Sequence, residues 1–124
     1  YLSGVNMCKK PELIFSSSAR TATLSATFNT DATEGLFFIN VSAVSATPSV
    51  TFAIDGVSPA GTTYNILTSA AITGTGLTVL RVSPHLTAAA NTVAKDILPQ
   101  AIKVTATHAD ADSITYSMYF MGME

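Results

Sequence analysis

Tryptophan is absent from this chain of 124 residues, and cysteine occurs once, as Cys8. One cysteine cannot form a disulfide bond within the chain. Charged residues make up 11% of the sequence, against a usual value of about 25%. The net charge of −2 offers no basic field for phosphate groups, so we expect no nucleic-acid partner. No apolar run approaches the roughly 18 residues that a membrane helix needs, so we expect no membrane partner.

Motifs that mark enzymes are also missing. No Gly-x-Ser-x-Gly elbow accompanies the serines, and Gly74 and Gly76 lack the spacing and the lysine of a phosphate-binding loop. His108, Asp110 and Asp112 lie close together, but calcium needs about six to eight oxygen ligands and zinc three or four. Such aspartates commonly form turns by accepting bonds from nearby backbone amides, and we favour that interpretation. The sequence therefore predicts no catalytic residue, no cofactor, no metal site and no enzymatic activity.

The residues that are abundant favour β-structure. Alanine, serine and threonine together supply 49 of the 124 residues, and 48% of the chain is apolar. Threonine suits strands because its branched β-carbon packs on a pleated surface. The length fits one domain with a core of its own. Charged side chains normally keep the surfaces of free monomers from associating. The low charge of this chain therefore predicts that neighbouring subunits cover part of its surface.

Apolar and polar residues alternate along most of the chain from about residue 20, which is the pattern of half-buried strands. The alternation predicts strands at 21–28, 36–44, 50–55, 63–68, 77–82, 101–108 and 113–120. A short polar break at 110–112 separates the last two, and we expect them to pair as an antiparallel hairpin. Residues 84–91 could form either a helical turn or a loop.

This spacing of strands predicts an all-β fold, a single antiparallel β-sandwich of immunoglobulin-like or jelly-roll-like kind. Residues 1–18 are predicted to form an N-terminal arm, with at most a short strand at 12–16, and residues 19–124 the β-sandwich domain. The arm is either a frayed end or a segment that becomes ordered on a neighbour. The expected core is Leu24, Phe28, Phe37, Ile39, Val41, Val50, Phe52, Ile54, Leu80, Val82, Ile102, Val104, Ile114 and Tyr116.

Apolar side chains outside this core are candidates for contacts between subunits. They occur in the arm, in the loop at 84–91 and in the Tyr- and Met-rich segment at 116–121. That last segment is either core and edge packing or a contact patch, because tyrosine and methionine are enriched at interfaces. The residues predicted to make such contacts are Leu13, Ile14, Phe15, Leu86, Tyr119 and Phe120.

Three segments resemble small tailed-phage and prophage structural proteins. Thr47-Pro-Ser-Val-Thr-Phe-Ala-Ile-Asp-Gly56 is similar to their T-P-T-L-T-(V/L)-x-I-x-G. Tyr64-Asn-Ile-Leu-Thr-Ser-Ala-Ala-Ile-Thr-Gly74 resembles Y-x-x-L-(T)-S-A-A-I-T, and His108-Ala-Asp-Ala-Asp-Ser-Ile-Thr-Tyr-Ser117 resembles H-x-D-A-D-S-I-T-Y-S. The order is preserved across about residues 19–118, and the N-terminal arm is not part of the match.

The resemblance implies a virion structural protein of the head decoration, or cement, type. Such a protein would lie on the capsid surface, bind the major capsid protein and form a homo-oligomer on the particle. Alternatives are a tail-tube or neck component, a tail-fibre component, or a carbohydrate-binding β-sandwich module. The absence of tryptophan argues against the last of these, since sugar sites usually present exposed aromatic platforms.

Overall fold

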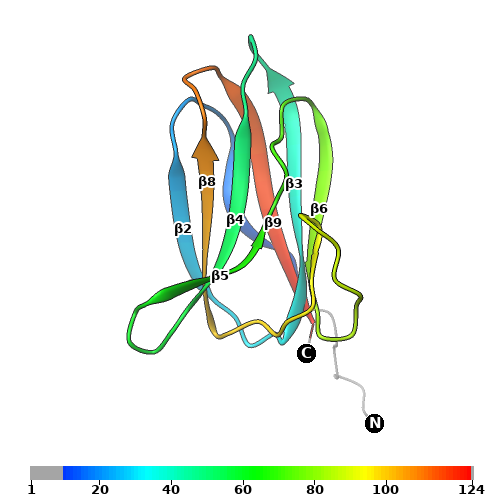
Figure 1. Ribbon diagram of the computed structural model, residues 1–124. Coiled ribbons are helices and arrows are strands. Elements are labelled where there is room, and N and C mark those ends of the chain that lie inside the picture. The colour runs from blue at the N-terminus through cyan, green and yellow to red at the C-terminus, as the bar shows by residue number, and fades with distance from the viewer. Residues whose placement is uncertain (1–9, 124) are drawn as a thin grey trace.

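The computed structural model describes residues 10–123, which form a two-layer β-sandwich (Figure 1). Sheet A has the strand order β1-β9-β3-β6-β7 and sheet B the order β2-β8-β4-β5. The strands of sheet A are β1 (Glu12–Arg20), β9 (Ile114–Met123), β3 (Glu34–Val44), β6 (Gly76–Val82) and β7 (Val93–Ala94). Those of sheet B are β2 (Leu24–Asn29), β8 (Ala101–His108), β4 (Val50–Val57) and β5 (Thr63–Thr68). The prediction of an all-β sandwich is confirmed.

Alternation along each strand places the core between the two sheets. In β4, Val50, Phe52 and Ile54 are fully buried, whereas Thr51 and Ala53 between them are only partly buried. The expected core is confirmed at all but two positions, because β2 is an edge strand and leaves Leu24 and Phe28 partly buried. The remaining members are Phe37, Ile39, Val41, Val50, Phe52, Ile54, Leu80, Val82, Ile102, Val104, Ile114 and Tyr116.

The predicted hairpin at the end of the chain is wrong. β8 pairs with β2 and β4, whereas β9 pairs with β1 and β3, so the chain crosses from sheet B to sheet A between them. The inner faces of the two strands meet across the core instead, where His108 Nε2 lies 3.0 Å from Tyr116 Oη. Alternation shows which face of a strand is buried and leaves its pairing partner open, and a short polar turn suits either connection.

The boundary of the predicted N-terminal arm is also wrong. β1 pairs antiparallel with β9 along most of its length, so residues 12–18 belong to the sandwich. Phe15 is 4% exposed and packs edge-on against Tyr116, with ring centroids 6.3 Å apart. The short strand expected at 12–16 exists and continues to Arg20. The first nine residues of the predicted arm, Cys8 among them, lie outside the described range.

β1 is an irregular edge strand that Arg20 stabilises. The register between β1 and β9 shifts on either side of Phe15. There the Arg20 guanidinium donates hydrogen bonds to the carbonyl oxygens of Ser16 at 2.6 Å and of Tyr116 at 2.8 Å. These bonds satisfy backbone carbonyl oxygens at the irregular part of the strand pair. The guanidinium carbon also lies 4.8 Å from the Tyr116 ring centroid, within the range of a cation–π contact. Such bulges hinder a further strand from adding to the edge.

The segment at 84–91 forms a loop between β6 and β7, so the alternative of a helical turn is set aside. Asn91 takes a positive φ of 64°, a conformation that asparagine tolerates better than most residues. Its side-chain amide donates to the carbonyl oxygen of Thr68 at 3.0 Å, which ties this loop of sheet A to the end of β5 in sheet B.

Candidate functional site

Reactive side chains do not gather into a centre within the described part of the chain. Residues 10–123 contain no group of three or more histidines, cysteines and acids placed to hold a metal ion. Every buried side-chain nitrogen or oxygen in that range has a hydrogen-bond partner. No helix there is long and apolar enough to cross a membrane.

In the turn at residues 108–112, the aspartate carboxylates accept hydrogen bonds from backbone amides. Asp110 Oδ1 accepts a bond from the Asp112 amide at 3.1 Å, and Asp112 Oδ2 accepts one from the Thr47 amide at 3.2 Å. His108 faces Tyr116 across the core, and burial, opposed by the nearby Asp110 carboxylate, lowers the pKa of its imidazole. Burial also raises the pKa of the Tyr116 hydroxyl to about 12, against an opposing effect of the Arg20 charge. These contacts are those of the turn that the sequence predicted.

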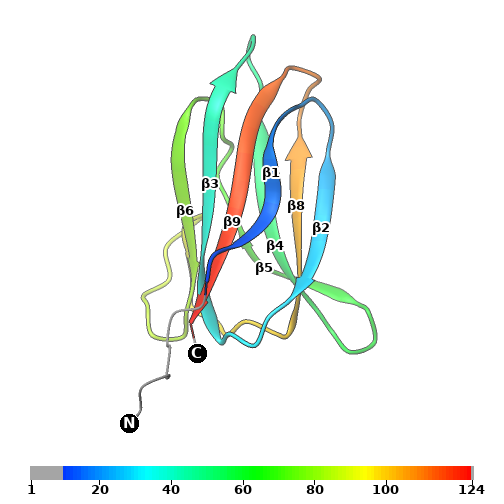
Figure 2. The same ribbon diagram turned by 180° about the vertical axis from the view of Figure 1, so that it is seen from behind.

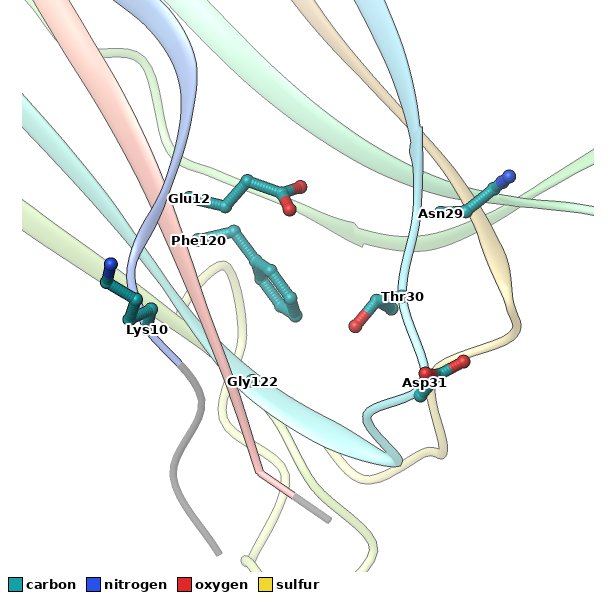
Figure 3. Close-up of a pocket in the computed structure, with 7 residues that line it drawn as sticks. All are labelled: Lys10, Glu12, Asn29, Thr30, Asp31, Phe120 and Gly122. Carbon is teal, nitrogen blue, oxygen red and sulfur yellow. The ribbon is translucent and has the colours of Figure 1, made fainter. Parts of the chain in front are cut away.

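A cleft of about 350 Å³ opens between the edge strands β1 and β2, near the end of the sandwich where β9 finishes (Figure 3). Figure 3 shows Glu12, Thr30 and Phe120 reaching toward this space, whereas Asn29 and Asp31 point away from it. The Thr30 hydroxyl already accepts a bond from the amide of Ala32 at 3.1 Å. Lys10 also lines the cleft, but Figure 3 shows its side chain directed away from the space that Glu12 and Phe120 enter.

The outer surface of sheet A differs from that of an ordinary half-solvated sheet. Phe37, Ile39 and Leu80 point into the core, so the residues alternating with them point outward. Most of those outward residues on one half of the sheet are large and apolar, although Asn40 and Ser117 lie beside them and Arg81 lies opposite Leu36. We call this surface the apolar face, which consists of Leu13, Leu36, Phe38, Leu77, Val79, Tyr119, Met121 and Met123.

Strand register makes the apolar face continuous. Leu13 on β1 lies opposite Tyr119 on β9, which lies opposite Phe38 on β3, which lies opposite Val79 on β6. Residues directly opposite on paired strands share a face and touch. An unbroken apolar row therefore crosses four strands, and Figure 2 shows these strands in front, with no other labelled strand over them.

The outer surface of sheet B is polar by comparison. Lys103, Thr105 and Thr107 alternate with buried residues along β8, and Thr51 and Asp55 do so along β4. This is the usual division of an antiparallel sheet into a dry and a wet face. The two layers of the sandwich thus present chemically different surfaces, and only sheet A exposes a broad apolar one.

The predicted contact residues divide into two groups. Leu13 and Tyr119 lie on the apolar face and are 50% and 41% exposed. Leu86 is 39% exposed and lines an apolar groove of about 210 Å³, together with Leu36 and Met123 of the apolar face.

The other three predicted contact residues point inward. Phe15 and Phe120 are only 4% and 3% exposed, so predicting them as contacts with another subunit is wrong. Phe120 packs instead against Phe28 and Phe37, with ring centroids 5.2 and 4.9 Å away. Ile14 is partly buried against the core.

Sequence reasoning missed the centre of the apolar face. Phe38, Leu36 and Val79 were not among the residues predicted to make contacts. The available signal was the run of four apolar residues at 36–39, which cannot all be buried on one side of a strand. Sequence alone could not show that β9 and β6 place Tyr119 and Val79 beside Phe38.

Fold and surface together define an all-β sandwich protein with one unpartnered apolar sheet face. No family model and no curated protein sequence matches the chain. A chain in the structure of infectious bursal disease virus Gx strain is similar, with 12% sequence identity and a TM-score of 0.39. The similarity covers 90% of the present chain and 31% of the viral one, so the present chain spans less than a third of that protein.

Proposed function

We propose that this protein is a non-enzymatic structural component of a virion, most specifically a decoration protein that binds the major capsid protein on the outside of the shell. The observation that carries this proposal is the apolar face, a surface suited to adhesion. The three segments that resemble tailed-phage structural proteins support the choice of a virion. The absence of an assembled reactive centre among residues 10–123 is compatible with a role that needs none.

Binding of this protein across neighbouring capsid subunits would add binding free energy to the shell. The contacts that supply this free energy would have to break before the shell could open. Leu77, Leu13 and Tyr119 are 61%, 50% and 41% exposed, and the other members of the apolar face are partly buried. The largest apolar patch of a typical monomer measures about 300–600 Å², and burying a patch of that size would contribute roughly 8–15 kcal/mol at about 25 cal/mol per Å². Association costs of about 4–15 kcal/mol offset most of that gain, so a single contact is weak. Many copies on a lattice would act together through avidity.

The test compares particles that contain the protein with particles from which its gene has been deleted. We expect a reconstruction to show the sandwich on the outer surface of the shell, and the deleted particles to release their genome at a temperature several degrees lower. Adding the purified protein back should restore the heat tolerance of the deleted particles. If purified particles lacked the protein, the virion role would be contradicted. If the reconstruction placed the protein in the tail, a tail-tube or tail-fibre role would replace the decoration role. Equal heat tolerance would remove the cementing mechanism.

A further inference from the structure

We propose that the outer edge of β2 is a docking site for an extended peptide segment of another protein, which adds a strand to sheet B and places one basic side chain in the cleft between β1 and β2. The site lies away from the apolar face of sheet A, so the inference goes beyond the proposed function. Its test uses the purified protein and needs no particle, so the two proposals can fail separately.

Three of the four sheet edges in the described part of the chain are protected against a further strand. β1 has an irregular register, and Arg20 donates to the carbonyl oxygen of Ser16 there. β7 has only two residues. The pairing of β5 with β4 is also irregular, and the Asn91 side chain donates to the carbonyl oxygen of Thr68 at the end of β5. Short strands, bulges and covering loops are means by which proteins prevent pairing at an edge.

β2, the fourth edge, has none of these features. Its register with β8 is regular from Leu24 to Asn29, and its six residues include no charged side chain and no proline. Residues 10–123 contribute no further strand to its outer side. Figures 1 and 2 both show β2 beside β8 on one side only, with the β4–β5 hairpin projecting below its lower end. A regular, uncharged edge strand is a template for pairing with another chain.

Backbone groups on alternate residues of β2 point away from the sheet. The Thr30 amide donates to the carbonyl oxygen of Gln100 at 2.8 Å, which continues the register of β2 with β8. In an antiparallel pair, residues that bond to the partner strand alternate with residues whose amide and carbonyl groups point the other way. Ser25, Thr27 and Asn29 therefore direct these groups outward. No strand within residues 10–123 pairs with them, so they offer three donors and three acceptors to a peptide.

The cleft beside β2 gives such a peptide a pocket for one side chain. It opens between β1 and β2 and has a volume of about 350 Å³. A strand added to β2 would direct alternate side chains to the same side as Phe28, toward sheet A. The Phe120 ring lines the cleft and lies 5.2 Å from the Phe28 ring, measured between centroids. The space beside these rings suits a long side chain with an apolar stem.

The charges of the cleft favour a basic side chain. Glu12 and Asp31 contribute carboxylates to its lining, and Lys10 contributes one ammonium group. Figure 3 shows the Glu12 carboxylate directed into the space beside Phe120, whereas Lys10 points away. An arginine of the peptide would place its methylene groups along the phenyl ring and its guanidinium beside Glu12. In strand addition, backbone bonds supply affinity and pockets of this kind supply specificity.

The experiment is an NMR titration of the full purified chain with the capped peptide Thr-Val-Thr-Arg-Thr-Val-Thr and with a second peptide that carries glutamate in place of arginine. Both sequences read the same in either direction, so both strand orientations present the central side chain alike. We expect the arginine peptide to bind with a dissociation constant below about 1 mM, as small interfaces do. The largest amide shifts should lie at Ser25, Thr27 and Asn29. The glutamate peptide should bind about 3–10-fold more weakly, because exposed charge pairs contribute little.

The control variants separate the backbone contacts from the charge. Thr27→Pro removes one outward donor and places its ring against the incoming strand, and proline is tolerated at such an edge position. It should weaken the binding of both peptides about 10-fold or more, whereas Thr27→Ala keeps the amide and should change it at most about twofold. Glu12→Gln should preserve binding and bring the affinities of the two peptides within about twofold of each other.

The amide spectra also show whether each variant is folded, and Ser25→Pro replaces Thr27→Pro if the latter unfolds. An absence of shifts at about 1 mM peptide, or binding that survives in a folded proline variant, would overturn the inference. Equal affinities of the two peptides for the wild-type chain would overturn the assignment of a basic side chain to the cleft. If the chain without peptide sediments at twice 12.9 kDa and Thr27→Pro makes it monomeric, a second copy occupies the edge and the inference is wrong.

Discussion

Replacing Arg20 by alanine should destabilise the sandwich far more than an ordinary surface substitution. The guanidinium donates to the carbonyl oxygens of Ser16 at 2.6 Å and Tyr116 at 2.8 Å, and it lies over the Tyr116 ring. Water can replace the donor at exposed Ser16, but the Tyr116 carbonyl is partly buried beneath the guanidinium. A hydrogen bond to a charged group contributes about 1.5–3 kcal/mol, and a cation–π contact about 0.5–1 kcal/mol. We therefore expect a loss of about 2–4 kcal/mol.

Thermal and urea unfolding measure this loss directly. For a domain of this size, the loss corresponds to a decrease in Tm of roughly 8–15 °C. Arg20→Lys should recover only part of it, because an ammonium cannot reach two carbonyls in the planar geometry of a guanidinium. Arg81→Ala is the matched control: Arg81 is exposed, and its side chain makes no hydrogen bond to any residue in the described range, so its removal should cost at most about 0.5 kcal/mol.

All four proteins must be compared at one protein concentration, since association stabilises the folded state. Equal midpoints for the alanine variants of Arg20 and Arg81 would refute the reasoning. Such a result would mean that the irregular register of β1 is held by packing of Phe15 alone, with the guanidinium contributing nothing measurable.

Three other predictions concern the core and its two sheets. Phe52→Ala should cost about 3–5 kcal/mol, because the ring is fully buried against Tyr116; an unchanged Tm would contradict the assignment of faces in β4. Burial raises the pKa of Tyr116 from 10.0 to about 12 in the folded state. The protonated hydroxyl therefore contributes fully to the free energy of unfolding below pH 10, and this free energy should fall by roughly 2–3 kcal/mol between pH 10 and 12. Urea titrations at alkaline pH should show this decrease, and Tyr116→Phe should remove that part of the slope. Gly122→Ala should cost about 1–3 kcal/mol, because a new Cβ would lie 2.4 Å from the Cβ of Ala32, whereas Gly74→Ala meets nothing within 4 Å. Equal Tm values for these two glycine variants would show that β9 and the 30–33 segment can separate without cost.

The surface that carries the proposed function was only half visible in the sequence. Leu13 and Tyr119 could be named because each is a large apolar side chain outside the expected core. Phe15 and Phe120 were named for the same reason, and both are buried. Apolar character alone cannot distinguish a residue that faces the core from one that faces solvent. Alternation from Tyr116 places Phe120 on the buried side of β9 and Tyr119 on the outer side, whereas Phe15 lies at an irregular register that alternation does not reveal.

The sequence by itself determined where the strands lie and which side of most of them is buried. A strand exposes alternate residues on opposite sides whatever its neighbours are, so Phe52, Val104 and Tyr116 could be assigned to the core from the pattern alone. Tertiary structure decided which strands pair, since pairing uses backbone groups that every residue carries. It placed consecutive β8 and β9 in different sheets, brought Phe38 beside Tyr119 from strands far apart in the chain, and so created the apolar face.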